Sequence, residues 1–155
     1  MYTKEQLQRM VIDAARRYGI DERIALAQIQ RESGFNPNAR GAAGEIGIAQ
    51  FMPSTAAAYG LSPQDLFDPV KALDAWGRHM RDLLARYNGD YAKALAAYNA
   101  GPKRVDRNQI PASTRQYVAA ILSAAGVDTP NPTQADQSLM WLAAIAIGAL
   151  ILSRV

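Results

Sequence analysis

Apolar positions recur at helical spacing along most of this chain. Leu7, Val11, Ala14 and Tyr18 fall three or four residues apart, and Gly19 follows as a stop signal. A second segment of the same kind begins after Asp21, an N-cap residue, and continues to residue 32. No segment alternates in the manner of a strand, so the expected fold class is all-α or nearly so.

Start and stop signals predict the later helices. Pro53 and the pair Asp68-Pro69 are typical first-turn sequences, and Ser62-Pro63-Gln64-Asp65 has the pattern of a capping box. Breaks are expected at Gly60, Asn88-Gly89 and Gly101-Pro102. The helices expected after residue 52 therefore cover about 54–59, 69–87, 90–99 and 113–125, and Gly126 is expected as the last C-cap.

Between residues 33 and 52 the apolar periodicity disappears. The segment concentrates four glycines (Gly34, Gly41, Gly44 and Gly47) with a proline and two asparagines. A loop of this length inside a compact domain is usually functional. We therefore expect a structured loop that carries part of a site.

Composition narrows the function classes. The 155 residues are 49% hydrophobic and 20% charged, which is ordinary for one globular domain. The absence of cysteine excludes disulfides and thiolate metal sites, and a single histidine, His79, argues against zinc and is interpreted as structural. The net charge of +3 comes from scattered residues, which suits an anionic polymer or lipid surface but does not indicate nucleic-acid binding.

Glu32 is the candidate catalytic group. It follows an amphipathic segment, where burial can raise the pKa of a carboxyl until the group donates a proton near neutral pH. Position alone favours an ordinary solvated or capping glutamate. The residues around it change this interpretation.

Three motifs occur in a fixed order: Glu32-Ser33, then Gly47-Ile48-Ala49-Gln50, then Ala97-Tyr98-Asn99-Ala100-Gly101. In this order and spacing they resemble the soluble lytic transglycosylase family, which has a lysozyme-like fold, and the resemblance extends over about residues 10–126. A fourth segment, 110–118, resembles a family stretch in which a glutamate commonly precedes Thr-Arg-x-Tyr.

The chain departs from the family pattern at three positions. Ser113 replaces the glutamate of the fourth segment, and Gly41 stands where members often carry a serine. Glu45 is an extra carboxylate within the loop. It is interpreted either as structural or solvent-facing, or as an added substrate contact.

The resemblance implies a peptidoglycan lytic transglycosylase. In such enzymes one glutamate protonates the glycosidic oxygen between MurNAc and GlcNAc and then deprotonates the C6 hydroxyl of MurNAc, which closes a 1,6-anhydro ring without water. Glu32 takes that role by resemblance, and no cofactor or metal is implied. The implied substrate-binding residues are Gln50, Met52, Tyr98 and Asn99, with the Tyr98 hydroxyl expected to reach Glu32.

Two other functions remain open at this point. A hydrolytic muramidase would admit water to the same site, and residue types alone do not separate it from a transglycosylase. A non-enzymatic glycan-binding or structural virion component would keep the fold without the activity. Loss of Glu32 is the expected signature of that second alternative, and Glu32 is present.

The C-terminal segment has a different composition. We divide the chain into a domain at 1–126, a linker at 127–137 and a hydrophobic helix at 138–155. Residues 139–152 carry no charge, and roughly 14 residues of helix span ~21 Å, which is short against a bilayer core of ~30 Å. The segment is interpreted as a membrane anchor or as a helix buried in an assembly.

The N-terminal residues lack an apolar stretch of the signal-peptide type. Because peptidoglycan lies outside the cytoplasm, delivery within a bacteriophage particle that acts in the host periplasm during genome entry is the expected setting.

Overall fold

The computed structural model describes residues 1–127 of the chain. The expected hydrophobic helix at 138–155 and all but the first residue of the expected linker at 127–137 lie outside the described residues. Within residues 1–127 no helix combines the length and apolarity needed to cross a membrane.

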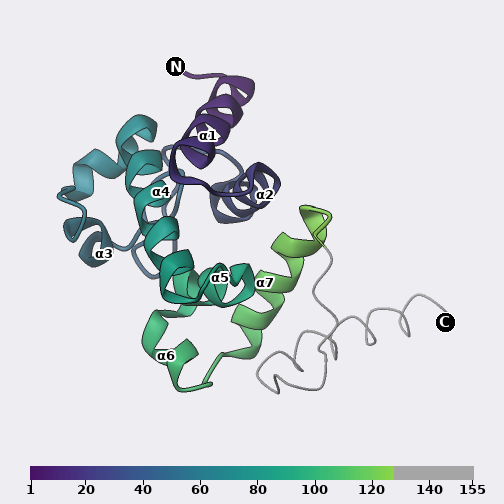
Figure 1. Cartoon of the computed structure of the whole chain (residues 1–155). Coiled ribbons are helices and arrows are strands. Elements are labelled where there is room, and N and C mark those ends of the chain that lie inside the picture. Colours follow the sequence, from purple (N-terminus) through teal and green to yellow (C-terminus); the bar gives the residue numbers. More distant parts are fainter. Residues whose placement is uncertain (128–155) are drawn as a thin grey trace, which may run out of the picture.

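The described part is built from helices joined by short turns and one long loop (Figure 1). The α-helices are α1 (Lys4–Tyr18), α2 (Glu22–Ser33), α3 (Pro53–Ala57), α4 (Pro69–Arg86), α5 (Tyr91–Ala100), α6 (Pro102–Asp106) and α7 (Ala112–Ala124), and η1 (Pro63–Phe67) is a 3₁₀ helix. The only β pairing in residues 1–127 is a set of isolated bridges in the loop, so the all-α prediction is confirmed. Helix α6 is not predicted by the sequence, because Gly101-Pro102 was interpreted as a terminus rather than as a new first turn.

The predicted N-cap residues begin three of these helices. The side chains of Asp21, Asp68 and Asp90 each accept a backbone N–H in the first turn of the helix that follows. The Ser62 capping box is present, although it opens a 3₁₀ helix. At the end of α7 the C-cap is Ala125 rather than Gly126, so that prediction is wrong.

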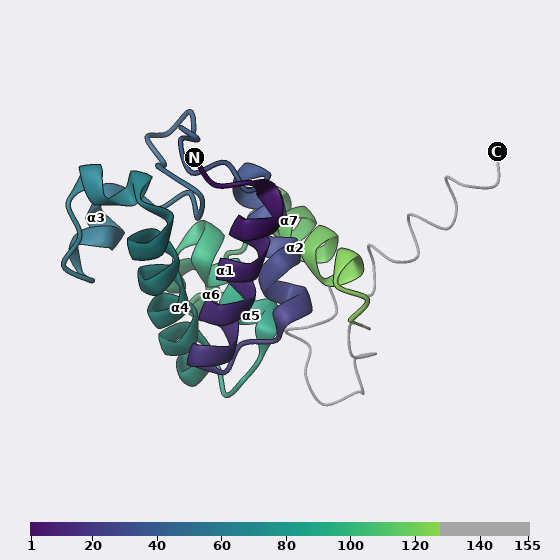
Figure 2. The ribbon, with the colours of Figure 1, turned by 90° about the horizontal axis from the view of Figure 1, so that it is seen from above.

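Helix α4, with 18 residues, is the longest helix within residues 1–127. It packs against α1 on one side and α5 on another, while α7 packs against both α2 and α5 (Figures 1 and 2). Trp76 of α4 is fully buried, together with Met80 on the same helix and Leu95 of α5. Burial of these large apolar side chains supplies the main driving force for folding.

The loop 34–52 contributes residues 46–49 to the folded core, while residues 42–44 at its tip are exposed. Ile48 and Ala49 are fully buried, and Ile46 pairs with both Arg40 and Phe51 through backbone bridges. The Ser33 hydroxyl donates to the Ile48 carbonyl oxygen at 2.7 Å. The expected structured loop is therefore confirmed, and its backbone is fixed against the end of α2.

Gly47 allows the tightest approach within this loop. Its φ is +80°, and a Cβ atom at this position would collide with the backbone carbonyl of Leu66 in η1. Gly89, in the turn after α4, has φ of +81° with open space around it. Both positions therefore require a positive φ, but only Gly47 is closely packed against another segment.

We expect Gly47→Ala to destabilise the fold more than Gly89→Ala. Both variants pay about 1–2 kcal/mol for a left-handed non-glycine residue, and Gly47→Ala adds about 1–3 kcal/mol for overpacking. The free energy of unfolding from urea titrations measures the difference. Equal losses would show that the loop moves away from η1 without cost.

Candidate active site

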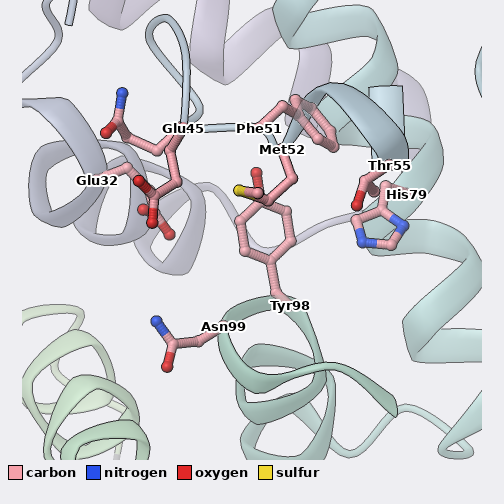
Figure 3. A pocket seen from close by; sticks show the side chains of 9 residues that line it. Glu32, Glu45, Phe51, Met52, Thr55, His79, Tyr98 and Asn99 are labelled. Atoms are coloured by element: carbon pink, nitrogen blue, oxygen red, sulfur yellow. The ribbon is translucent and has the colours of Figure 1, made fainter. Parts of the chain in front are cut away.

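The three sequence motifs meet at one cleft of about 450 Å³ (Figure 3). Its walls come from the end of α2, the loop, and helices α3, α4 and α5. The lining residues are Glu32, Glu45, Gln50, Phe51, Met52, Thr55, His79, Tyr98 and Asn99. Every residue that the sequence analysis assigned to catalysis or substrate binding is among them.

Glu32 lies in the last turn of α2, just before the left-handed Gly34 that ends the helix. The pKa of its carboxyl is raised to about 7, mainly by burial and to a smaller extent by the negative charge of Glu45. The hydrogen bond from Tyr117 and the positive charge of Arg31 lower it. The net result is a carboxyl that can hold and release a proton near neutral pH.

The tyrosine that contacts Glu32 is Tyr117, not Tyr98. The Tyr117 hydroxyl donates to Oε1 of Glu32, whereas the Tyr98 hydroxyl donates to the Ala49 carbonyl oxygen at 2.6 Å. The expectation that Tyr98 would reach the acid is therefore wrong. Tyr98 instead joins α5 to the loop, and so it holds the Gly47–Gln50 motif in the cleft wall.

Gln50 is held by the same loop. Its backbone has φ of +49°, and its side-chain Nε2 donates to the Gly47 carbonyl oxygen at 2.9 Å. Because this bond fixes the amide plane, the side chain presents a defined face to the cleft. The glycine and the glutamine of the motif thus depend on each other.

Glu45 and Gly41 form a matched pair. The Glu45 carboxylate accepts the Ala43 backbone N–H at 3.0 Å. A Cβ atom at position 41 would collide with this carboxylate, and it would also lie close to the Gln50 amide oxygen. The two positions are therefore coupled, because the absence of a side chain at Gly41 leaves room for the Glu45 carboxylate in the cleft.

Asn99 and the fourth segment are joined through α7. The Thr114 hydroxyl donates to Oδ1 of Asn99 at 2.7 Å, one turn before Tyr117 on the same helix. The Thr-Arg-x-Tyr segment therefore supplies both a support for Asn99 and the donor to Glu32. Sequence reasoning did not assign Tyr117 to the site, although its place in that segment was the signal that could have done so.

His79 closes the far side of the cleft with a set of aromatic rings. Its ring centroid lies 5.4 Å from that of Tyr98 and 5.9 Å from that of Phe51. Burial lowers the pKa of the imidazole, so it is neutral at pH 7. His79 is thus both a packed histidine, as predicted from the sequence, and a cleft residue.

The tautomer of His79 follows from its partner. The Tyr59 hydroxyl lies 2.9 Å from Nδ1 of His79 and donates to Asp82 at 3.1 Å. Since that single hydrogen goes to Asp82, Nδ1 must donate to the Tyr59 oxygen, and Nε2 carries the lone pair. Among residues 1–127 there is no group of three or more acidic, histidine or cysteine side chains suited to a metal ion.

Comparison with known proteins agrees with this geometry. The Transglycosylase SLT domain family matches residues 9–120. The chain is 30% identical over 109 residues to the transglycosylase of Enterobacteria phage PRD1, covering 70% of this chain and 39% of that protein. It is 34% identical over 95 residues to the peptidoglycan transglycosylase gp16 of Escherichia phage T7, covering 58% of this chain and 7% of that protein.

Solved structures show the same likeness. The lytic transglycosylase Slt of Pseudomonas aeruginosa, solved as an inactive glutamate-to-glutamine mutant, superposes with a TM-score of 0.68 at 27% identity, covering 76% of this chain and 23% of that one. The 70 kDa soluble lytic transglycosylase of Escherichia coli gives a TM-score of 0.65 at 28% identity, covering 73% and 23%.

The chain belongs to the Transglycosylase SLT domain family and has its lysozyme-like fold. It spans well under half the length of the curated relatives described above. What those longer proteins do as wholes is therefore carried to this chain only as a proposal.

We expect Glu45→Gln to lower the pKa of Glu32, because it removes a negative charge that disfavours ionisation of the acid. The carboxyl carbon chemical shift of Glu32, followed against pH by NMR, measures the change directly. Glu5→Gln, at the exposed start of α1, is the matched control for loss of one charge. A Glu32 pKa that moves equally in both variants would contradict a local effect of Glu45.

Proposed function

We propose that this chain is a peptidoglycan lytic transglycosylase, in which Glu32 acts first as the acid and then as the base. The observation that carries the proposal is the half-buried carboxyl of Glu32 in the cleft, whose pKa desolvation raises to about 7. Membership of the transglycosylase family gives the substrate class, the β-1,4 bond between MurNAc and GlcNAc. The inactive glutamate-to-glutamine mutant of the Pseudomonas aeruginosa relative agrees with dependence on one glutamate.

One carboxyl is sufficient for this reaction because the substrate supplies the nucleophile. Protonated Glu32 gives its proton to the glycosidic oxygen, and the bond to C1 of MurNAc breaks. The resulting carboxylate then takes the proton of the C6 hydroxyl, whose oxygen bonds to C1 and closes the 1,6-anhydro ring. Glu32 is protonated again at the end, and no water is consumed.

Substrate contacts are assigned to the side chains around Glu32. Gln50, Met52 and Asn99 line the cleft beside it and are proposed to bind the sugar hydroxyl and N-acetyl groups. Tyr98 is proposed to act through the loop that it anchors, while its ring contributes to the aromatic wall. Met52 is 39% exposed, so its side chain is available to a bound glycan.

A hydrolytic muramidase is the second candidate, because the cleft contains a second carboxylate. Glu45 places a second carboxylate in the same cleft, and hydrolytic glycosidases ordinarily use two. The two reactions give different products from one substrate: 1,6-anhydro ends or reducing ends.

We expect Glu32→Gln to reduce cleavage of purified peptidoglycan by roughly 10⁴-fold, the upper range for loss of a general acid. Product release is followed by mass spectrometry, which also identifies the ends: 1,6-anhydromuropeptides from the unmodified protein support the proposal, and reducing ends support the muramidase. Glu22→Gln, on the exposed start of the same helix, controls for loss of a carboxylate. Substantial cleavage by a folded Glu32→Gln protein would exclude the assigned role.

The relatives suggest where the activity is used. The phage PRD1 and T7 proteins are named as transglycosylases, which supports a role in local opening of the cell wall during phage genome entry. In that setting the enzyme is carried by the virion and acts in the host periplasm. A non-enzymatic virion component of the same fold would lack cleavage in the assay described above.

The apolar C-terminal sequence is proposed to anchor the enzyme to a membrane or to a hydrophobic partner in an assembly. The argument is from sequence alone: residues 139–152 carry no charge, Trp141 suits an interfacial position, and Arg154 follows the apolar run. No residue assigned to the site lies in this part of the chain.

We expect a chain that ends at Gly126 to cleave peptidoglycan in solution and to lose partitioning into lipid vesicles. Replacing Ala146 and Ile147 with lysine in the full chain should have the same effect on partitioning, because each charge near a bilayer centre costs about 2.5–3.5 kcal/mol. Vesicle co-sedimentation measures this loss. If both variants still bind vesicles, the anchor lies elsewhere, and if the shortened chain does not fold, the domain boundary is wrong.

A further inference from the structure

Gln28 is a polar side chain for which the site described so far gives no reason. It is fully buried on α2, one turn before Glu32. A buried amide is costly unless it is hydrogen-bonded, so its partners indicate its role. Both partners are buried aromatic residues from other helices, Trp76 of α4 and Tyr117 of α7.

The contacts form a continuous series of hydrogen bonds from the core to the Glu32 carboxyl. Trp76 Nε1 donates to Oε1 of Gln28 at 3.1 Å, and Nε2 of Gln28 donates to the Tyr117 oxygen at 3.4 Å, the weakest bond of the chain. The Tyr117 hydroxyl then donates to Oε1 of Glu32. Three helices thus contribute to the orientation of one hydroxyl group.

The donor and acceptor roles in this series of hydrogen bonds are fixed by Trp76. An indole nitrogen can only donate, so the Gln28 amide must turn its oxygen to Trp76 and its nitrogen to Tyr117. An amide nitrogen can also only donate, so the Tyr117 oxygen accepts from it. The single hydroxyl hydrogen of Tyr117 is then left for Glu32.

This direction decides which oxygen of Glu32 carries the proton. Oε1 accepts the hydrogen bond from the Tyr117 hydroxyl. If the proton of Glu32 were on Oε1, it would point at the Tyr117 oxygen. The tyrosine hydrogen would then be buried without an acceptor, which costs free energy. Oε2 receives no hydrogen bond from residues 1–127, and it is not among their side-chain atoms that are buried without a partner. Because Glu32 lines the cleft (Figure 3), the accessible Oε2 is the oxygen available to a bound glycan.

We propose that Gln28 and Trp76 are positioning residues that hold the Tyr117 hydroxyl as a donor to Oε1 of Glu32 and thereby keep the transferable proton on Oε2. This inference rests on the proposed function of Glu32. During the first step the Oε2–H bond breaks as the proton moves to the glycosidic oxygen, and the Tyr117 hydrogen bond stabilises the carboxylate that forms. Oε2 then accepts the proton of the C6 hydroxyl.

Gln28→Met tests the proposal, because methionine has a similar length but neither accepts from Trp76 nor donates to Tyr117. We expect kcat for glycan cleavage to fall about tenfold, which is the loss expected when one hydrogen bond to a charged group is weakened. KM should change less than about twofold, because the Tyr117 hydrogen bond stabilises the carboxylate that forms in the transition state and does not contact the bound glycan. Ile24→Val, a buried apolar residue one turn earlier on α2, is the control and should change Tm without changing kcat.

The pH profile separates a positioning role from a merely structural one. The groups that shift the pKa of Glu32 are Glu45, Arg31 and Tyr117, and Tyr98 is also electrostatically coupled to it. Of these contacts only the Tyr117 hydrogen bond involves a partner of Gln28. That bond lowers the pKa of Glu32, so weakening it raises the pKa. Activity of a general acid falls as pH rises through its pKa, so the basic limb of the Gln28→Met profile should move to higher pH.

A double-mutant cycle with Tyr117→Phe completes the test. If Gln28 acts through Tyr117, Gln28→Met should have little further effect on kcat in the Tyr117→Phe background. An equal loss of kcat in both backgrounds, or an unmoved basic limb, would overturn the proposal. If Gln28→Met does not fold, Trp76→Phe takes its place in the cycle. This variant removes the indole N–H, so the Gln28 amide can rotate and exchange the positions of its oxygen and nitrogen. An unmodified protein without cleavage would count against the proposed function instead.

Discussion

The site depends on one constraint: a carboxyl must lose most of its contact with bulk water and still face a substrate. Glu32 meets this constraint at the C-terminal end of α2, where the helix dipole also disfavours a negative charge. Its carboxyl retains a hydrogen bond from Tyr117 and access to the cleft. A more exposed glutamate would be ionised at neutral pH, and a fully enclosed one could not reach a glycan.

The helical bundle is arranged around this requirement. Two motif residues hold the loop rather than contact the acid: Ser33 donates to the Ile48 carbonyl oxygen, and Tyr98 donates to that of Ala49. The loop backbone is thus tied to α2 on one side and α5 on the other, with Gln50 directed between them. This gives a physical role to the serine that follows Glu32 and to the tyrosine of the third motif.

Much of this arrangement could be predicted from the sequence. Caps such as Asp21, Asp68 and Asp90 act within a few residues of their position, so local reasoning located the helices well. The cleft residues were found because the motifs carry them. The partner of Glu32 was assigned wrongly because Tyr117 lies 85 residues away, and only the packing of α7 against α2 brings the two together. The pairing of Gly41 with Glu45 was missed for a related reason: a loop without periodicity gives no indication of which side chains share a space.

The raised pKa of Glu32 also has a consequence for the stability of the whole domain. The ordinary pKa of this carboxyl is 4.5 and its pKa in the fold is about 7, so between these values the native protein holds a proton that the unfolded chain releases. The resulting stabilisation is fully present below pH 4.5 and is lost as pH rises through about 7, a loss of up to about 3 kcal/mol. Net stabilities of domains are commonly about 5–15 kcal/mol, so this is a considerable fraction. Ionisation of the group proposed to cleave the glycan therefore also destabilises the fold in alkaline solution. A bound substrate that favours protonated Glu32 would raise the free energy of unfolding.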